Sequence, residues 1–344
     1  MQKYKKANDI KVGVVGYGGA FNMGKQHLQQ MLAAGMTPLA VTEVDAGRLV
    51  AARADFPGIE TYPTVGAMLK KSRVDLVVII TPHNTHAQLT LQCLRAGRHV
   101  VCEKPLAITT AEVDAMIAAA KKSGVILSTY HNRHWDGCIL EAVERIKKQK
   151  VIGDIIRIEC HMGGYNLPRD WWRSSRTVSG GILYDWGVHL LEYSLQLIDA
   201  ELTEVSGFSH HGFWAPLTKW KKDTIEDEGF AVVRFKGGQW LTLAISSIDS
   251  KPKDGRLEIT GTKGTYVLDG NDHTIYRHAD GEAVTVKKNN RADATHKYYE
   301  NVRDHLVKGK PLTITGEWSR RPIHILDLAV RSAKAGKALT VKYV

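Results

Sequence analysis

One stretch near the start of the chain decides the fold: Lys11-Val12-Gly13-Val14-Val15-Gly16-Tyr17-Gly18-Gly19-Ala20-Phe21. An apolar strand enters a glycine turn, and Leu28, Met31 and Leu32 follow at helical spacing. Glycines let the backbone approach a diphosphate, and the start of a helix favours its negative charge. The stretch therefore predicts a dinucleotide-binding turn. Phe21 stands where the G-x-G-x-x-G pattern has its third glycine, and we expect a lengthened turn, with Asn22-Met23-Gly24 before the helix proper.

The next strand, Leu39 to Glu43, ends on an acid. A carboxylate at this place suits the ribose hydroxyls of NAD and repels the 2′-phosphate of NADP. No arginine directly follows Glu43, so NAD is favoured over NADP. Asp45 is expected to cap a helix that begins near Ala46.

Strands and helices then alternate. Val74 to Ile80 is nearly all apolar, as in a strand covered on both faces, and the polar run from Thr81 to His86 follows it. A strand at 98–102 leads into Glu103-Lys104-Pro105, a helix at 110–122 starts with the capping-box pair Thr109 and Glu112, and a strand at 125–129 follows. This alternation predicts a doubly wound parallel sheet of the Rossmann type, an α/β fold, with its ligand at the carboxyl ends of the strands.

The pattern changes after about residue 130. Alternating apolar residues predict strands at 154–159, 201–208, 228–236, 239–247, 256–261, 264–269 and 273–277. They indicate a C-terminal α+β domain with an open, mostly antiparallel sheet whose free face suits a second subunit. We expect an NAD-binding domain at 1–130 and a substrate-binding and oligomerisation domain at 131–344. A helix at about 317–335 is expected to pack near the junction.

Composition narrows the class of protein. The net charge of +11 is spread along the chain without a nucleic-acid-binding motif, so we expect no nucleic-acid partner. No apolar run is long enough for a membrane span, and the polar, basic start has no signal-peptide pattern. The four cysteines lie far apart in apolar surroundings, which predicts reduced thiols and a cytoplasmic location. His83 with His86, and His210 with His211, lack a metal-ligand pattern, so no metal is expected.

A second stretch carries chemistry: Gly180-Gly181-Ile182-Leu183-Tyr184-Asp185-Trp186-Gly187-Val188-His189. On a helix, Asp185 and His189 lie one turn apart, and a carboxylate near a histidine raises its basicity. The alternative is a structural ion pair with a core histidine. Lys104 lies at a strand end. It either contacts a bound ligand or is a solvated loop residue.

These stretches together resemble the glucose–fructose oxidoreductase / inositol dehydrogenase / MocA (Gfo/Idh/MocA) family over essentially the whole chain. The matching residues are the glycine turn, Thr81-Pro82 with His86, Glu103-Lys104-Pro105, and Gly180-Gly181 with Asp185, Gly187 and His189. Thr315 to Trp318, followed by Arg320-Arg321-Pro322, is similar to the family's last helix. The resemblance implies a nicotinamide cofactor, a small-molecule carbohydrate or polyol substrate and a homodimer or homotetramer.

The resemblance also implies roles for residues. The catalytic set is Lys104, Asp185 and His189. The cofactor set is Gly16, Gly18, Gly19, Ala20, Phe21, Glu43, Thr81, Pro82, Asn84, His86, Glu103 and Lys104. Independently of the resemblance, the polar and aromatic residues after strand 125–129 and the tryptophans of the 163–179 loop suit a sugar site, so the substrate set adds His131, Arg133 and Trp172 to the three catalytic residues. Arg133 is equally suited to a structural ion pair, and Trp171 and Trp172 to anchoring a loop.

The predicted function is an NAD-dependent oxidoreductase that transfers a hydride between nicotinamide and a ring hydroxyl of a sugar, inositol or related cyclic polyol. His189 is expected to take the hydroxyl proton, while Lys104 hydrogen-bonds the same oxygen. One alternative is an NAD-dependent glycosidase that acts through a transient 3-keto sugar, with His131 and His134 supplying an additional base. A non-catalytic cofactor-binding protein is a further alternative, against which Lys104, Asp185 and His189 argue.

Overall fold

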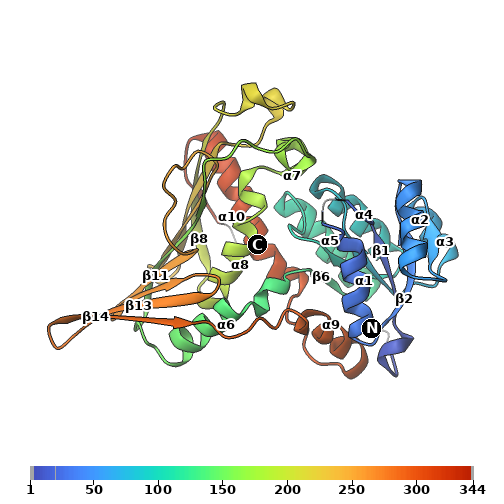
Figure 1. Ribbon diagram of the computed structural model, residues 1–344, viewed down its shortest axis with the longest axis horizontal. Coiled ribbons are helices and arrows are strands. Elements are labelled where there is room, and N and C mark those ends of the chain that lie inside the picture. The colour runs from blue at the N-terminus through green and yellow to red at the C-terminus, as the bar shows by residue number, and fades with distance from the viewer. Residues whose placement is uncertain (1–3, 20, 342–344) are drawn as a thin grey trace. The chain divides into compact units, whose positions relative to one another are not determined.

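The computed structural model describes residues 4–19 and 21–341. They form two compact units (Figure 1). The first unit comprises Met1–Asn132 and His296–Arg320, and the second comprises Arg133–Thr295 and Arg321–Val344. Among the described residues, no helix has both the length and the apolar character that a membrane span needs.

The first unit is built on a six-stranded parallel sheet in the order β3-β2-β1-β4-β5-β6. Its strands are β1 (Lys11–Val15), β2 (Thr37–Thr42), β3 (Glu60–Tyr62), β4 (Leu76–Ile79), β5 (His99–Cys102) and β6 (Leu127–Thr129). Its helices are η1 (Ala7–Asp9), α1 (Met23–Ala33), α2 (Ala46–Asp55), α3 (Val65–Lys71), α4 (His83–Arg95), α5 (Thr110–Ser123) and α9 (Lys297–Lys308). The predicted doubly wound parallel sheet is confirmed.

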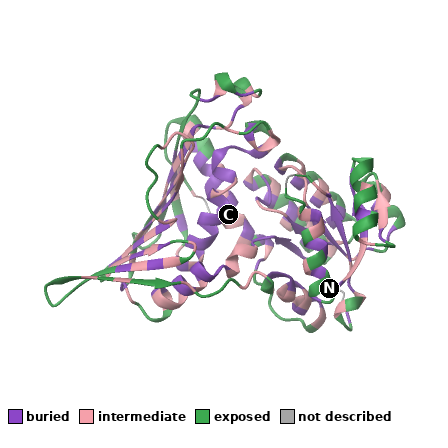
Figure 2. Ribbon diagram, viewed as in Figure 1, coloured by how far each residue is buried: buried purple, intermediate pink, exposed green. Residues whose placement is uncertain are grey.

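The central strands of this sheet are apolar because both of their faces are covered. All four residues of β4 are fully buried, and so are Val100 and Val101 of β5. In Figure 2 buried residues gather on the strands of this unit. The helix starts agree with their local sequence signals. Asp45 accepts hydrogen bonds from Gly47 N and Arg48 N, and Thr109 with Glu112 forms the expected capping box.

Helix α9 comes from far along the chain but belongs to the first unit. The Tyr298 hydroxyl lies 2.7 Å from Ser128 Oγ, and the Tyr299 hydroxyl lies 2.6 Å from His27 Nδ1. Both tyrosines are almost fully buried. The sequence predicts a second domain for all residues after 130, whereas this segment adds buried aromatic rings to the first unit's core.

The second unit contains a nine-stranded sheet in the order β14-β13-β12-β11-β7-β10-β9-β8-β15. Its strands are β7 (Ile155–Gly163), β8 (Leu202–His210), β9 (Glu228–Phe235), β10 (Trp240–Ser246), β11 (Leu257–Gly261), β12 (Gly264–Leu268), β13 (Asp272–Ala279), β14 (Glu282–Asn289) and β15 (Leu339–Thr340). The sheet is mostly antiparallel, as predicted, but β7 and β10 pair in parallel. The apolar pattern does not predict β14, because its charged residues weaken the alternation.

Short helices connect these strands. They are η2 (Asn132–Trp135), α6 (Gly137–Ala142), the π-helical η3 (Val143–Lys148), η4 (Trp172–Ser174), α7 (Arg176–Ser179), η5 (Ile182–Tyr184), α8 (Gly187–Leu197), η6 (Ala215–Leu217) and η7 (Lys221–Asp223). The last helix, α10 (Gly316–Ala335), starts in the first unit and continues in the second. The helix that was expected to carry both Asp185 and His189 is instead the 3₁₀ turn η5 followed by α8.

One face of the second sheet is buried. Burial alternates along β9, β10 and β11, and Leu241, Leu243 and Ile259 are fully buried. Helix α8 contacts β7 and β10. Residues at the alternate positions, whose side chains point to the other face of the sheet, are exposed; Trp240 and Phe208 are examples. The sheet therefore has one face on helices and one open face, as its period-two pattern predicts.

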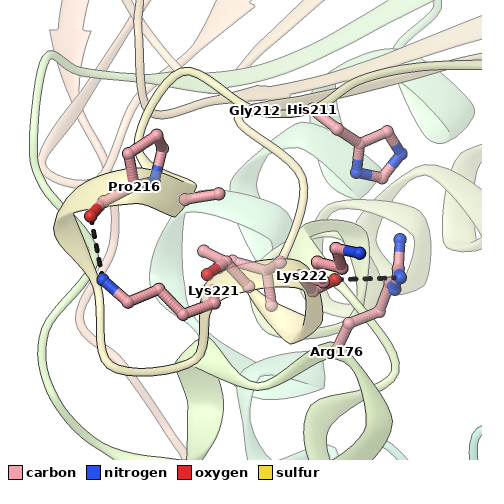
Figure 3. Close-up of a pocket in the computed structure, with 9 residues that line it drawn as sticks. Arg176, His211, Gly212, Pro216, Lys221 and Lys222 are labelled. Atoms are coloured by element: carbon pink, nitrogen blue, oxygen red, sulfur yellow. Dashed lines mark hydrogen bonds between the residues drawn. The ribbon is translucent and has the colours of Figure 1, made fainter.

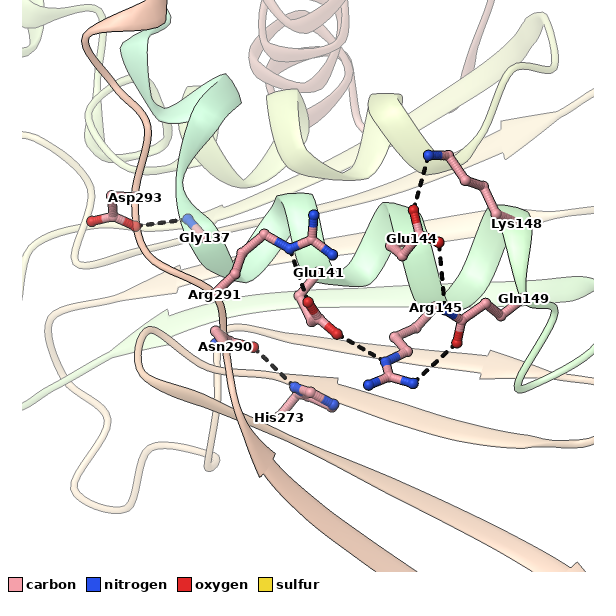
Figure 4. Close-up of polar contacts among 10 residues, drawn as sticks. All are labelled: Gly137, Glu141, Glu144, Arg145, Lys148, Gln149, His273, Asn290, Arg291 and Asp293. Atoms are coloured by element: carbon pink, nitrogen blue, oxygen red, sulfur yellow. Dashed lines mark hydrogen bonds and ion pairs between the residues drawn. The ribbon is translucent and has the colours of Figure 1, made fainter.

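A polar cluster fastens the segment after β14 to α6 (Figure 4). Glu141 accepts from Arg145 Nε at 2.8 Å and from Arg291 Nε at 2.9 Å. Asp293 accepts from Gly137 N at 2.7 Å. Burial raises the pKa of Glu141, but the two arginines more than offset it, so the net shift is downward and the carboxylate stays ionised.

Candidate active site

The glycine turn after β1 has the backbone that only glycine adopts easily. Gly16, Gly18 and Gly19 have φ values of +103°, +82° and +76°. A Cβ on Gly16 would lie 2.8 Å from the carbonyl oxygen of Ile80, whereas a Cβ on Gly19 would meet nothing within 4 Å. The turn is thus packed against the sheet at Gly16 and open at Gly19. Ala20, a predicted cofactor contact, lies outside the described residues.

The apparently missing third glycine has a counterpart in the structure. Gly24 lies in the first turn of α1, and a Cβ there would be 2.6 Å from Gly16 O and 3.0 Å from Tyr17 Cα. Close packing of helix on strand is the role of the third glycine in the fingerprint. Gly24 therefore fills that role, and the expectation that it precedes the helix is wrong, because α1 already begins at Met23, two residues earlier than expected.

The start of α1 fits an anion. The N-cap residue, Asn22, has a left-handed backbone and makes no side-chain hydrogen bond to the first amides of the helix. These amides point out of a helix end that carries partial positive charge. Phe21, just before it, is half exposed. The described part of the turn thus suits the diphosphate of a dinucleotide.

Glu43 lies at the carboxyl end of β2, buried to 7% exposure. Its carboxylate accepts hydrogen bonds from Tyr17 N at 2.8 Å, Val44 N at 2.8 Å and Asp45 N at 3.1 Å. It therefore holds the glycine turn in place, and a carboxylate with about four acceptor sites keeps capacity for a ribose hydroxyl.

Arg48 is a residue near the glycine turn that no sequence motif indicates. Its Nη1 lies 3.6 Å from Glu43 Oε2, and its side chain lies against Gly18, where a Cβ would be 3.2 Å from Arg48 Cδ. It reaches the glycine turn from the first turn of α2, and its side chain is 46% exposed. Arg48 does not directly follow the acid in the sequence. The first turn of α2 instead brings its side chain back toward Glu43 and the glycine turn.

The segment after β4 is fastened by His86. This fully buried imidazole lies with Nε2 2.8 Å from the Thr81 carbonyl and Nδ1 2.8 Å from the Pro105 carbonyl. It thereby joins the segments that follow β4 and β5. Burial lowers the pKa of His86, against the effect of the two carbonyls. Pro82 is the N-cap of α4, and Asn84 is exposed in its first turn.

The Glu103-Lys104-Pro105 segment leaves the end of β5, and its Lys104–Pro105 peptide bond is cis. Glu103 Oε2 accepts from Lys104 N at 3.0 Å, while Oε1 lies 3.0 Å from His27 Nε2. Lys104 is partly exposed. His131 follows β6 and is buried at 1% exposure.

In the second unit, the Gly180-Gly181 turn precedes η5. Gly181 has φ +119°, and a Cβ there would lie 2.6 Å from Glu226 Oε2. The same carboxylate accepts from Ile182 N at 2.7 Å, and Glu226 is 7% exposed. Glu226 thus holds the turn that leads to Asp185. Glu226 lies 44 residues from Ile182 in the sequence, so no local sequence pattern indicates this contact.

Asp185 follows η5 and lies 3.6 Å from Arg173 Nη1. The Arg173 guanidinium lies over the rings of Trp171 and Trp172, at 5.1 and 5.2 Å from their centroids. The predicted tryptophans therefore flank an arginine that pairs with Asp185. Asp185 precedes α8 rather than lying within it, but its backbone is already helical.

His189 is in the first turn of α8 and is 6% exposed. Its ring lies 5.5 Å from that of Trp186. The guanidinium of Arg133 lies 5.0 Å from the same indole and pairs with Asp136 at 3.0 Å. Arg133 thus forms an ion pair with Asp136, as the structural alternative for this residue predicts. It also packs on the indole of Trp186, next to His189.

Comparisons with known proteins agree with this architecture. The family model for the oxidoreductase family NAD-binding Rossmann fold matches residues 10–131, and that for the oxidoreductase family C-terminal alpha/beta domain matches residues 144–342. The scyllo-inositol 2-dehydrogenase (NADP(+)) IolW of Bacillus subtilis is 26% identical, with 98% of each chain covered.

Two further relatives are similar. The myo-inositol 2-dehydrogenase of Thermotoga maritima is 29% identical over 76% of this chain and 75% of its own. A solved structure of an NAD-binding protein from Listeria innocua has a TM-score of 0.82 and 27% identity, with 96% of each chain covered. Both domain matches together span most of the sequence. The chain therefore belongs to the Gfo/Idh/MocA family of oxidoreductases.

Proposed function

We propose that this oxidoreductase transfers a hydride between NAD and a ring hydroxyl of an inositol, a sugar or a related cyclic polyol. The first unit would hold the cofactor and the second would supply substrate contacts. The names of two relatives, which act on scyllo-inositol and myo-inositol, support cyclic polyols as the substrate class.

One observation carries the proposal: the candidate residues of the first unit share one edge of its sheet. The glycine turn follows β1, Glu43 follows β2, Thr81 comes after β4, and Lys104 after β5. These strands are neighbours in the sheet, and ligands of open parallel sheets bind at their carboxyl ends. The open glycine turn, the uncapped start of α1 and the carboxylate of Glu43 fit the diphosphate and ribose of a dinucleotide.

The chain's own residues would position the substrate and move its proton. A bound nicotinamide supplies the site that accepts or returns the hydride. His189 takes the proton of the reacting hydroxyl, and Asp185 favours the protonated imidazole by its charge. The Lys104 ammonium donates to the same oxygen and stabilises its developing negative charge. Arg173 holds Asp185 through its ion pair.

NAD is proposed as the preferred cofactor because the carboxylate of Glu43 repels a 2′-phosphate. Arg48 works in the opposite direction, since its guanidinium beside Glu43 is available to a phosphate. The relative IolW is named for NADP(+). The preference therefore depends on the balance between these two side chains.

The chain is also proposed to form a homodimer or homotetramer through the open face of the second sheet. Phe208, Trp240 and Tyr276 lie on this face and are 59%, 37% and 48% exposed. Large exposed apolar groups gathered on one face mark interaction surfaces. Light scattering of the purified chain would measure the oligomeric state. A monomeric Trp240→Glu variant would support this face as the subunit interface.

The activity is tested with inositols, sugars and glycosides in the presence of NAD or NADP. The expected result is stoichiometric NADH from a cyclic polyol. Lys104→Ala and His189→Ala are each expected to lower kcat by ~10²–10⁴-fold while NADH still binds. Lys122→Ala and His278→Ala, at exposed positions, are the matched controls.

Full activity of either catalytic variant would remove its proposed role. Release of an aglycone with only catalytic amounts of NAD would instead indicate the glycosidase. Tight NADH binding without turnover of any substrate would favour a cofactor-binding protein.

A further inference from the structure

The second unit contains a pocket of about 410 Å³ that none of the proposed catalytic or cofactor residues lines (Figure 3). Its wall comes from α7, from the segment after β8 and from η7 with the residues that follow it. We call it the basic pocket, after the side chains Arg176, His211, Lys221 and Lys222 that line it. The volume is in the range of small-molecule sites, ~300–1,000 Å³.

The charge of the basic pocket has one sign. Three of its lining residues are cations, one is a histidine, and no carboxylate is among them. In Figure 3 the Arg176 guanidinium, the Lys222 amine and the His211 ring lie on the same side of the pocket. A concave surface lined by charges of one sign attracts counter-ions. The pocket therefore favours an anionic group.

The neighbouring acid, Asp223, forms hydrogen bonds with Ser175 and Thr177 instead of lining the pocket. Its Oδ1 accepts from Thr177 N at 3.0 Å, and its carboxylate also binds the hydroxyls of Thr177 and Ser175. Burial raises the pKa of Asp223, but these hydrogen bonds more than offset it, so the net shift is downward. Asp223 is an ionised, hydrogen-bonded residue of the loop and does not line the pocket.

Two of the cations are held in place. Lys221 Nζ donates to the Pro216 carbonyl at 3.0 Å, and Arg176 Nη2 donates to the Lys222 carbonyl at 3.3 Å. Lys221 also has a left-handed backbone, φ +51°, which is uncommon for a residue other than glycine. An ammonium has three donors and a guanidinium five, so both keep donors for a ligand.

The remaining wall is mostly apolar: besides Gly212, it includes the polar side chain of Thr224, whose hydroxyl pairs with that of Thr218. Ala215, Pro216 and Ile225 line it. A ligand that fits these features has one anionic group and a compact body with an apolar face, such as a sugar ring. We propose that the basic pocket is a binding site for a small phosphorylated or carboxylated molecule, which contacts Arg176 and Lys222.

Binding is tested on the full chain by isothermal titration at low ionic strength. The probes are inorganic phosphate, glucose 6-phosphate and gluconate, with glucose as the neutral match. Saturating NADH is present throughout, so that binding of an anion at the glycine turn does not contribute. Saturable binding of a phosphorylated or carboxylated probe is expected, whereas any binding of glucose would belong to the proposed polyol site and should not depend on Arg176 or Lys222. The two anionic sugars distinguish phosphate from carboxylate as the recognised group.

Variants locate the site. Lys222→Gln and Arg176→Gln are each expected to weaken binding by about tenfold, as the loss of one charge-assisted contact does. Lys219→Gln is the control, because Lys219 belongs to the same loop but pairs with Asp170 and does not line the pocket. Since Lys222 is exposed, its replacement preserves the fold even if Arg176→Gln loosens the loop.

Three results would overturn the proposal. They are no saturable binding of any anionic probe, unchanged binding in Lys222→Gln and Arg176→Gln, and an equal loss in Lys219→Gln. Because the readout is binding, these outcomes are independent of whether the chain oxidises a polyol.

Discussion

The imidazole of His27 is paired with the carboxylate of Glu103 inside the first unit, with Nε2 3.0 Å from Oε1. On its other side, Nδ1 lies 2.6 Å from the hydroxyl of Tyr299. His27 is fully buried, and the second oxygen of Glu103 accepts from Lys104 N. Burial raises the pKa of Glu103, but the contact with His27 and the charge of Lys104 more than offset it, so the net shift is downward. Helices α1 and α9 are thus tied to the segment that carries Lys104.

Replacing His27 tests this pair. His27→Leu leaves the carboxylate of Glu103 without its buried donor, and we expect the free energy of unfolding to fall by about 1–3 kcal/mol. Tyr299→Phe removes one hydroxyl and is expected to cost about 1 kcal/mol. Urea denaturation at neutral pH measures both. A His27→Leu chain as stable as the parent would show that the pair does not stabilise the fold.

Gly24 is expected to be intolerant of any side chain. In Gly24→Ala the new methyl would meet Gly16 O and Tyr17, so α1 must move away from the glycine turn. We expect a loss of about 1–3 kcal/mol in stability and weaker NADH binding. The matched control is Gly66→Ala in α3, where the Cβ meets nothing closer than 3.5 Å. That change should be neutral or stabilising by up to about 1 kcal/mol. Equal effects of both would contradict the assigned role of Gly24.

Glu226 is predicted to be a positioning residue for the turn before Asp185. Glu226→Ala leaves the Ile182 amide without its buried acceptor, which costs about 1–3 kcal/mol. We expect kcat to fall more than NADH affinity, because the turn leads to Asp185 and His189. Glu226→Gln keeps an acceptor oxygen and should retain most of the activity. Steady-state kinetics and NADH titration separate the two effects, and a fully active Glu226→Ala chain would exclude the role.

Arg48 offers a test of cofactor preference. The parent chain is expected to use NAD better than NADP. Arg48→Ala should lower kcat/KM with NADP by about tenfold, since one charge-assisted contact to the 2′-phosphate is lost, and change that with NAD little. Initial rates with both cofactors measure this. If the parent chain prefers NADP and the Arg48→Ala chain does not, then Arg48 rather than Glu43 sets the cofactor preference.

His99 is expected to make stability depend on pH. It is 3% exposed, and Ile126 N donates to its Nδ1 at 3.2 Å, so it is held neutral. Burial lowers its pKa from 6.5 to about 4. The unfolded chain therefore takes up this proton first as the pH falls, and folding stability declines between pH 6.5 and about 4.

The full shift corresponds to about 3 kcal/mol. His99→Asn keeps an acceptor for the Ile126 amide but does not titrate. The variant should therefore lose less stability than the parent over the same pH range in urea denaturation. Parallel pH profiles of the two chains would contradict this assignment.

Much of the fold follows from local patterns. The alternation of apolar strands and helices in the first part, and the period-two strands in the second, predicted both sheets. The caps at Asp45 and Thr109 were also predictable, because a cap depends on residues within one helical turn. Strand β14 was missed because its exposed, charged positions leave little apolar alternation.

The sequence by itself determined most of the segments that become strands and helices, and that a glycine turn, an acid and a lysine each follow a strand of the first sheet. Only the tertiary structure decided that Gly24 takes the third glycine's role, that Arg48 returns to the turn, that α9 completes the core of the first unit, and that Glu226 holds Gly181. The physical reason is the range of the interactions. Periodicity and capping act over a few residues, whereas these contacts depend on how segments far apart in the chain pack together.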